Sequence, residues 1–310
     1  MTPVPVLVVG SVALDSVETP FGVREDALGG SATFFSCAAS FFTKPSLVGV
    51  VGEDFPAEHL RFLEGRGIDV SGLERVPGKT FRWKGRYAFD LNEAHTLDTQ
   101  LNVFGSFQPK LPAHLRQPKI LFLGNIHPEL QGKVLDEMAS RPPLVALDTM
   151  NFWISGSREP LLKVLARVDL LFINDAEARQ LSGEHNIVKA ARAIQSLGPK
   201  RLVIKRGEYG AVLFDGDHVF HAPAFPLEDV FDPTGAGDSF AGGCLGWLAH
   251  KDDHGPGSLR QACMAGSTMA SFCVERFSLD RFRELSQAEI ERRLQAFRAL
   301  MHVEEIPPLL

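Results

Sequence analysis

The sequence predicts an α/β fold, a doubly wound and mainly parallel sheet with helices on both faces. Short, wholly apolar runs recur along the chain, and each is followed by a segment with a helical pattern. Strands buried on both faces are continuous in apolar residues, and strand–helix alternation is typical of parallel sheets. With 310 residues, 45% of them hydrophobic, the chain can bury one large core, so we expect a single domain over residues 1–310.

The elements of this sheet follow from the apolar runs. Strands are expected at residues 5–9, 47–51, 120–123, 144–147, 170–173 and 202–204. Residues 31–42 and 56–65 have the pattern of the first two helices. Two further apolar runs, 211–214 and 218–222, are separated by Asp215-Gly216-Asp217 and predict a hairpin. From Gly235 onward the chain is expected to be helical with breaks.

A second, smaller sheet is predicted by a different period. Polar and apolar residues alternate from position 80 to 87, as in a strand with one wet face, which does not suit a doubly covered sheet. We therefore expect a small β-lid, formed by segments of approximately 12–28 and 80–107. One face of the strand is basic and the other aromatic: Thr80, Arg82, Lys84 and Arg86 against Phe81, Trp83 and Tyr87. A solvent-facing basic face is favoured over one that meets an anionic acceptor.

Composition argues against several classes of partner. The formal net charge is -6 and no basic stripe stands out, so neither nucleic acid nor a membrane surface is an expected partner. The cysteines form no metal-ligand spacing and predict buried free thiols. No signal peptide or transmembrane run is apparent, and a cytoplasmic location is expected.

The strongest local feature is the run from Asp232 to Gly243, rich in glycine and other small residues. A helix is expected to begin near Gly237-Asp238. Its first backbone amides have no partner within the helix, and together with the helix dipole they favour an anion such as a transferring phosphoryl group. A carboxylate at that end, Asp238, can accept the proton of an attacking hydroxyl. The alternative is that Asp238 only caps the helix.

The stretch Asp232-Pro233-Thr234-Gly235-Ala236-Gly237-Asp238 resembles the C-terminal signature of the ribokinase/PfkB carbohydrate kinase family. The resemblance implies a ribokinase-like fold and transfer of the γ-phosphate of ATP to a hydroxyl of a small-molecule substrate: a sugar, nucleoside or related polyol. It implies Asp238 as the base, an anion hole from the amides of Gly235, Ala236 and Gly237, and a nucleotide contact from Thr234.

Other matches are spread along the chain. Asn174-Asp175-Ala176-Glu177 is similar to the family's N-x-x-E motif, which implies that Glu177 orders Mg²⁺ through water, with Asn174 nearby. The turn that contains Lys205, Gly207 and Gly210 is similar to the one beneath the nucleotide. Asp15, Gly29 and Gly30 resemble the acceptor-binding elements. Val51-Gly52-Glu53-Asp54-Phe55 matches V-G-x-D and is interpreted as structural.

The acceptor side departs from the family pattern. The Asn that often follows the double glycine is absent, and Phe34-Phe35 occupies its neighbourhood. Packing in the core is the favoured interpretation of these rings, and stacking on a base or sugar is the other. Asp148 and Asn151, in a loop after a strand, are candidates for acceptor or phosphate contacts. A sugar and a nucleoside both stay open as acceptors.

Rival functions have less support. No G-x-G-x-x-G or G-x-x-x-x-G-K-[ST] occurs, which disfavours a dinucleotide oxidoreductase and a Walker-type NTPase. A non-catalytic nucleotide or metabolite sensor on a kinase fold is the serious alternative. The resemblance also implies a K⁺ ion near the glycine turn. Family members often dimerise through the lid, which leaves a homodimer open for this chain.

Overall fold

The computed structural model describes residues 4–91 and 94–305. Within them, the main sheet has the strand order β13-β12-β11-β10-β9-β8-β1-β4-β5. Neighbours from β11 to β5 run parallel, and β12 and β13 add antiparallel pairs at one edge. The bounds are β1 Val4–Val9, β4 Pro45–Gly52, β5 Asp69–Val76, β8 Pro118–Leu123, β9 Leu144–Asp148, β10 Leu170–Asn174, β11 Arg201–Lys205, β12 Ala211–Asp215 and β13 His218–Ala222. The predicted mainly parallel sheet and its terminal hairpin are confirmed.

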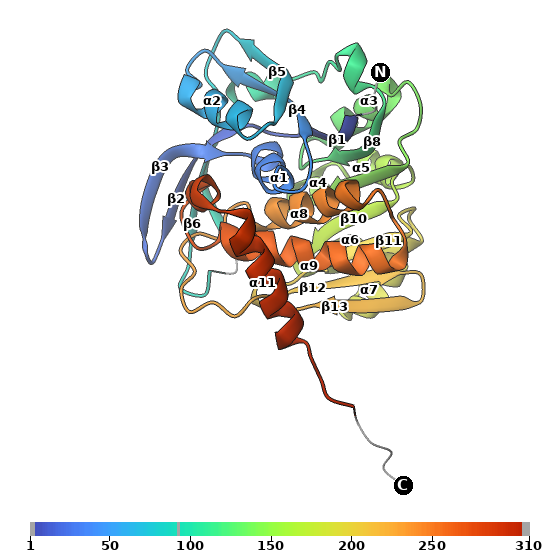
Figure 1. Cartoon of the computed structure of the whole chain (residues 1–310). Coiled ribbons are helices and arrows are strands. Elements are labelled where there is room, and N and C mark those ends of the chain that lie inside the picture. The colour runs from blue at the N-terminus through green and yellow to red at the C-terminus, as the bar shows by residue number, and fades with distance from the viewer. Residues whose placement is uncertain (1–3, 92–93, 306–310) are drawn as a thin grey trace.

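Helices cover both faces of this sheet (Figure 1). Side chains alternate along β1, so that Val6 and Val8 join one core cluster while Leu7 and Val9 join the other. The first cluster takes in α1 Ser31–Ala39, α2 Ala57–Gly65, α8 Ala236–Lys251, α9 Pro256–Cys273, α10 Asp280–Glu284 and α11 Gln287–Leu300. The second takes in α3 Pro128–Glu137, α4 Asn151–Gly156, α5 Arg158–Leu165, α6 Asp175–Ser182 and α7 Ile187–Gln195. Burial on both sides explains why the interior residues of the central strands are apolar.

A separate four-stranded sheet of order β3-β2-β6-β7 lies beside the main domain (Figure 1). Its strands are β2 Ala13–Thr19, β3 Gly22–Gly29, β6 Phe81–Tyr87 and β7 Ala94–Gln100. We call this sheet the lid. β2 pairs antiparallel with β3 and β6 with β7, whereas β2 and β6 run parallel. After β7 the 3-10 helix η1, Asn102–Ser106, returns the chain to the body, where Val103 and Phe107 join the core.

The lid departs from simple alternation in β6. The register with β7 shifts between Lys84 and Gly85, and the Trp83 ring lies where a side chain at Gly85 would stand, 2.1 Å from the Cβ position. On the basic face, Arg86 pairs with Glu18 of β2 at 2.9 Å and Arg82 with Asp26 of β3 at 3.2 Å. Because these two cations already have carboxylate partners, the basic face has less free charge for an anionic acceptor, which favours the interpretation as a solvent-facing strand.

One strand of the main sheet was not predicted. β5 closes the main sheet beside β4, and its residues are mostly part-exposed. Polar residues such as Asp69, Ser71 and Glu74 interrupt the apolar run, because an edge strand has less to bury than a central one. Its pattern therefore does not stand out from a loop.

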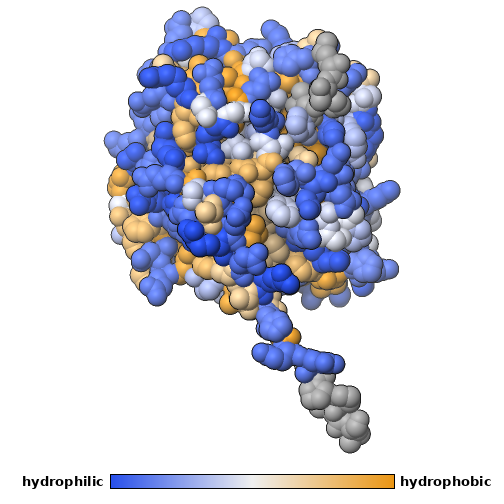
Figure 2. Space-filling model, in the orientation of Figure 1, coloured by the Kyte–Doolittle hydropathy of each residue, from blue (hydrophilic) through white to orange (hydrophobic). Residues whose placement is uncertain are grey.

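The distribution of polar residues on the surface and of cysteines in the core agrees with what the composition predicted. Figure 2 shows hydrophilic residues over much of the visible face, with hydrophobic ones between them. Cys37, Cys244, Cys263 and Cys273 are free and buried, as predicted. Among the described residues, no helix is both long and apolar enough to cross a membrane.

Candidate active site

Three neighbouring strands end on polar residues at one edge of the main sheet. Asp148 is the last residue of β9, Asn174 of β10 and Lys205 of β11. The carboxyl ends of parallel strands are where doubly wound sheets bind ligands. Electrostatic interactions join Asp148 and Lys205 to Asp238 in the first turn of α8. The site is therefore assembled between the sheet edge and the start of this helix.

The glycine turn at the start of α8 depends on close packing. Gly235 is the N-cap and has φ 75, a left-handed conformation that favours glycine. A Cβ at Gly235 would lie 2.3 Å from the Phe34 ring, so no side chain fits there. The turn is held by Asp232, whose carboxylate accepts the amides of Thr234 at 2.9 Å and Ser278 at 3.0 Å.

The predicted anion hole has two kinds of amide in this structure. The amide of Ala236 donates to the carbonyl of Pro233 at 3.1 Å and closes the turn. Among the described residues, the amides of Gly235 and Gly237 have no backbone hydrogen bond outside the helix. Groups at a helix N-terminus without a partner are suited to an anion.

Asp238 does not act as a helix cap. It lies inside α8, after the N-cap Gly235, and its carboxylate has no hydrogen bond within the described part of the chain. Burial and, to a smaller extent, the nearby charge of Asp148 raise the pKa of Asp238 to about 7, against the opposite effect of Lys205. A carboxyl with a pKa close to neutral is well matched to proton transfer.

Lys205 provides positive charge at the centre of the site. Its Nζ donates to Asp148 Oδ2 at 2.7 Å, and the two side chains are 18% and 7% exposed. Burial alone would lower the pKa of Lys205, but Asp148 and Glu177 raise it, so the ammonium stays protonated. Nζ is 2.8 Å from the Cβ position of Gly237. The ammonium therefore lies against the first turn of α8, where a bound phosphate would meet it.

Asn174 and Glu177 form a capping box at the start of α6. Asn174 Oδ1 accepts the amide of Glu177 at 2.8 Å, and Glu177 Oε2 accepts the amide of Asn174 at 2.9 Å. Burial raises the pKa of Glu177 to about 7, with Asp148 adding to the effect. No group of three metal-ligating side chains occurs in the described ranges. One carboxylate facing Asp148 suits Mg²⁺ held through water and phosphate oxygens.

The turn after β11 has the geometry of a tight, glycine-dependent loop. The amide of Arg206 donates to the carbonyl of Gly210 at 2.7 Å, and the amide of Gly210 to Gly207 at 3.1 Å. Gly207 has φ 53 and Gly210 φ 81. A Cβ at Gly210 would lie 2.2 Å from the carbonyl oxygen of Ala222. These glycines let the chain turn directly behind Lys205 into β12.

The residues expected on the acceptor side lie in the lid or next to it: Asp15 on β2, Gly29 at the end of β3, and Gly30 directly after it as the N-cap of α1. Asp15, on β2, is buried and accepts the amide of Gly30 at 3.3 Å. A Cβ at Gly29 would lie 1.9 Å from Asp15 Oδ2, which explains the first glycine of the pair. Burial raises the pKa of Asp15 to about 7, with contributions from Asp232 and Asp238. Asp15 is therefore within electrostatic reach of Asp238.

Other candidates are distributed differently. Phe34 and Phe35 are both buried. Phe35 stacks on Phe122 at 4.3 Å between ring centroids and packs the core, whereas Phe34 also lines a small hollow with Asp15 and Thr234. Asn151 is exposed at the start of α4 and lines a hollow of about 320 Å³ with Phe152, Ser155, Gly156 and Gln180. Neither Asp148 nor Asp238 lines this hollow, so within the described ranges the structure does not join Asn151 to the aspartates.

Two residues at the site had not been singled out for it from the sequence. The hydroxyl of Tyr87, at the end of lid strand β6, lies 3.3 Å from the hydroxyl of Thr234. Ser278 donates its amide to Asp232 and its hydroxyl to the carbonyl of Leu28 on β3, at 2.6 Å. In the sequence, Tyr87 did not differ from the other aromatic residues of its strand, and Ser278 lay in no recognisable motif. Both connect the glycine turn to the lid.

Comparison with known proteins agrees with this geometry. The family model "pfkB family carbohydrate kinase" matches residues 6–283. A cytidine kinase of Thermococcus kodakarensis is 32% identical over 247 residues, covering 77% of this chain and 86% of that protein. Among solved structures, a putative Ribokinase II from E. coli in complex with ATP and Mg²⁺ has a TM-score of 0.76 at 19% identity, covering 94% of this chain and 99% of that one.

A Burkholderia thailandensis nucleoside kinase in complex with inosine has a TM-score of 0.74 at 19% identity, covering 95% of this chain and 99% of that one. Identities this low establish the shared ribokinase-like fold alone. The family match spans the main sheet, the lid strands and the glycine turn, and the cytidine kinase aligns over most of the same length. This chain therefore belongs to the pfkB family of carbohydrate kinases.

Proposed function

We propose that the protein transfers the γ-phosphate of ATP to a hydroxyl of a nucleoside, with Asp238 as the general base. The observation that carries the proposal is the position of Asp238. Its carboxyl, with a pKa raised to about 7, lies in the first turn of α8, within electrostatic reach of both Asp15 and Lys205. One carboxyl thus adjoins an acceptor-binding group and a phosphate-binding group.

The proposed reaction needs one proton transfer and charge neutralisation. Asp238 accepts the proton of the acceptor hydroxyl as its oxygen bonds to the γ-phosphorus, and the bond from that phosphorus to the bridging oxygen of ADP breaks. The amides of Gly235 and Gly237 and the ammonium of Lys205 stabilise the charge on the transferring group. Bound Mg²⁺ supplies further positive charge to the phosphates, and Glu177 is the residue that would hold it through water.

The acceptor half of the site consists of Asp15, Gly29 and Gly30. The buried carboxylate of Asp15 can accept hydrogen bonds from sugar hydroxyls, and the glycines leave room for the ligand beside the backbone. A ribose within a nucleoside is favoured over a free sugar because the cytidine kinase relative matches 77% of this chain. A free sugar is the second candidate and is favoured by the family description. The K⁺ ion and the lid dimer remain predictions from the resemblance.

A coupled ADP-release assay with Mg-ATP tests this proposal. The panel contains cytidine, uridine, adenosine, inosine, ribose, fructose and glucose, and Asp238→Asn is assayed beside the unsubstituted protein. We expect turnover of at least one nucleoside and a loss of about a hundredfold or more in kcat for the variant, with ATP still bound. Turnover of free sugars alone would overturn the nucleoside assignment. Nucleotide binding without turnover of any panel member would favour the sensor alternative.

A further inference from the structure

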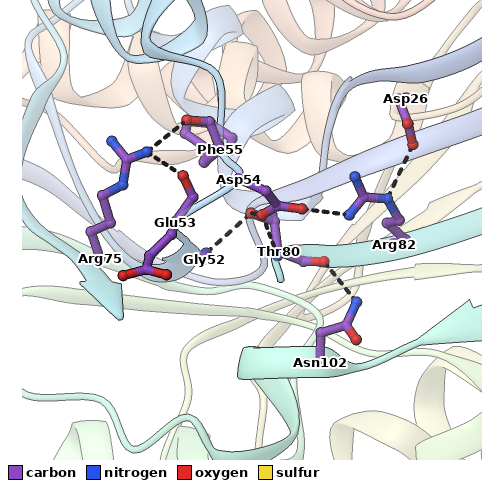
Figure 3. A network of polar contacts seen from close by, with 9 residues as sticks. All are labelled: Asp26, Gly52, Glu53, Asp54, Phe55, Arg75, Thr80, Arg82 and Asn102. Carbon is purple, nitrogen blue, oxygen red and sulfur yellow. Dashed lines mark hydrogen bonds and ion pairs between the residues drawn. The ribbon is translucent and has the colours of Figure 1, made fainter. Parts of the chain in front are cut away.

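The stretch Val51-Gly52-Glu53-Asp54-Phe55, made of the end of β4 and the loop after it, lies where the chain passes between the body and the lid. The chain enters the lid twice: first through residues 10–12, between β1 and β2, with a return through Gly30 between β3 and α1, and again through residues 77–80, between β5 and β6, with a return through residues 101–103 after β7. Figure 3 shows Gly52, Asp54, Thr80, Arg82 and Asn102 gathered around this point. The V-G-x-D stretch therefore contacts the second of these two attachments of the lid.

Thr80 is the residue at which these segments meet. Asp54 Oδ1 accepts both its amide and its hydroxyl, each at 2.7 Å. The hydroxyl of Thr80 in turn accepts the amide of Gly52 at 3.0 Å, and its carbonyl accepts Asn102 Nδ2 at 2.9 Å. Thr80 is fully buried, and every polar atom it has is bonded. Body loop, entering strand and returning strand are thus joined through one residue.

The backbone of residues 78–80 also packs closely against the loop after β4 and against Val103. A Cβ at Gly52 would lie 2.3 Å from the carbonyl oxygen of Gly78 and 2.6 Å from the amide nitrogen of Thr80. The amide of Glu53 donates to the carbonyl of Gly78 at 3.0 Å, and that of Val103 to Lys79 at 3.2 Å. A segment fixed in this way can act as a pivot but cannot slide.

Arg82, two residues further into the lid, adds a second and more exposed link. Its Nη1 donates to Asp54 Oδ2 at 2.8 Å and its Nε to Asp26 Oδ1 at 3.2 Å. Asp26 lies on β3, at the far side of the lid sheet from β7. Burial alone would raise the pKa of Asp54, but hydrogen bonds from Arg82 and Thr80 lower it, so it stays ionised. One guanidinium thus connects two lid strands to a carboxylate of the body (Figure 3).

We propose that Asp54 and Arg82 are positioning residues: Asp54 fixes the pivot of the lid at Thr80, and Arg82 holds the lid at a set angle over the active site. Rotation of the lid about Thr80 moves β3 relative to the loop after β4. Arg82 and Asp26 both belong to the lid and move together, so such a rotation would break the contact of Arg82 with Asp54. Asp15 and Gly29 lie on lid strands, so this angle sets their distance from Asp238.

The inference has two parts. The structural part, that Asp54 and Arg82 hold the lid at its attachment, is independent of the proposed function. The catalytic part, that the lid angle sets the distance of Asp15 from Asp238, rests on it. The chain offers a matched control in Arg86, which lies on the same strand and, among the described residues, pairs only within the lid, with Glu18 at 2.9 Å. Arg82→Gln and Arg86→Gln each remove one cation from β6. Only the first removes a link to the body.

Hydrogen exchange of the ligand-free protein, followed by mass spectrometry, tests the structural part. We expect Arg82→Gln to speed exchange about tenfold in peptides that cover 78–82 and 101–104, where Thr80 and Val103 donate, and to leave α8 and α9 unchanged. Arg82→Lys should restore part of the protection, and Arg86→Gln should match the unsubstituted protein. Equal exchange in Arg82→Gln and Arg86→Gln, or a uniform increase over the whole chain, would overturn the inference.

Kinetics with cytidine and Mg-ATP test the catalytic part. Since the lid carries the acceptor contacts, Arg82→Gln should raise KM for cytidine about threefold or more and leave KM for ATP within about twofold. Equal changes in both constants would contradict a positioning role. Should the unsubstituted protein turn over no nucleoside, the proposed function fails, and the exchange data still decide whether the pivot exists.

Discussion

The raised pKa of Asp238 predicts that this residue destabilises the fold at neutral pH, and that Asp238→Asn makes the protein more stable. In the unfolded chain the carboxyl has its ordinary pKa of 3.8, and in the folded protein a pKa of about 7. Between these values the folded state holds a proton that the unfolded state has released. The free energy of unfolding therefore falls as pH rises from about 4 to about 7, and the loss is complete above about 7.

The size of the effect follows from the shift. At about 1.4 kcal/mol per pKa unit, a shift of about three units sets an upper limit of about 4 kcal/mol. Asp238 is only partly buried, so solvent screening reduces this, and we expect a gain of about 1–3 kcal/mol for Asp238→Asn at pH 8. At pH 5 the unsubstituted carboxyl is still protonated in the folded state, and the gain should be smaller by about half or more.

Urea unfolding of Asp238→Asn and the unsubstituted protein at pH 5 and pH 8 measures this difference. Asp217→Asn, at an exposed position of the β12–β13 turn, is the control and should change stability little at either pH. An equal gain for Asp238→Asn at both pH values, or a loss at pH 8, would refute the pKa argument. The same shift predicts that kcat/KM rises with pH through about 7, because only the ionised carboxylate can accept a proton.

Three further predictions concern the groups around Asp238. Lys205→Met leaves a buried carboxylate unpaired and should cost about 3–5 kcal/mol in urea unfolding, together with a large rise in KM for ATP; unchanged stability would contradict the ion pair. Gly235→Ala should lower the melting temperature and turnover much more than Gly216→Ala, because both have positive φ but only Gly235 faces a ring, that of Phe34; equal effects would refute the packing argument. Glu177→Gln should raise the Mg²⁺ concentration needed for half-maximal turnover about tenfold and leave KM for the acceptor unchanged; a normal Mg²⁺ titration would exclude the proposed role.

Local patterns in the sequence were enough for the main sheet and the glycine turn. β1, and β10 up to Ile173, are apolar because both of their faces are buried, and such a run is visible without knowledge of its neighbours. The turn before α8 is equally local, since a left-handed conformation at Gly235 itself favours glycine. β5 was not predicted, because this edge strand contains polar residues that interrupt its apolar pattern. Its pairing with β4 also cannot be recognised from the local sequence of β5 alone.

The site itself could be predicted only in part, because its contacts join distant segments. Lys205 and Asp148 are separated by 57 positions, and no local motif announces their ion pair. Tyr87 and Thr234 are separated by 147 positions. The V-G-x-D motif predicted a structural role for Asp54. Its hydrogen-bond partners, Thr80 and Arg82, could not be predicted, because they reach Asp54 only when the lid packs against the body.

The division of the site between lid and body has a consequence for inhibition. Asp15 and Gly29 belong to lid strands, whereas Gly235, Asp238 and Lys205 belong to the body. If the proposed function holds, a compound that imitates only the acceptor would contact mainly the lid residues Asp15 and Gly29, and opening of the lid would release it. A bisubstrate compound, with an acceptor analogue joined to a phosphate-bearing tail, would bind the lid and the body at once. Once one half is bound, the other half binds at a high effective concentration because it is tethered to the first. Such a compound would be released far more slowly than either of its halves.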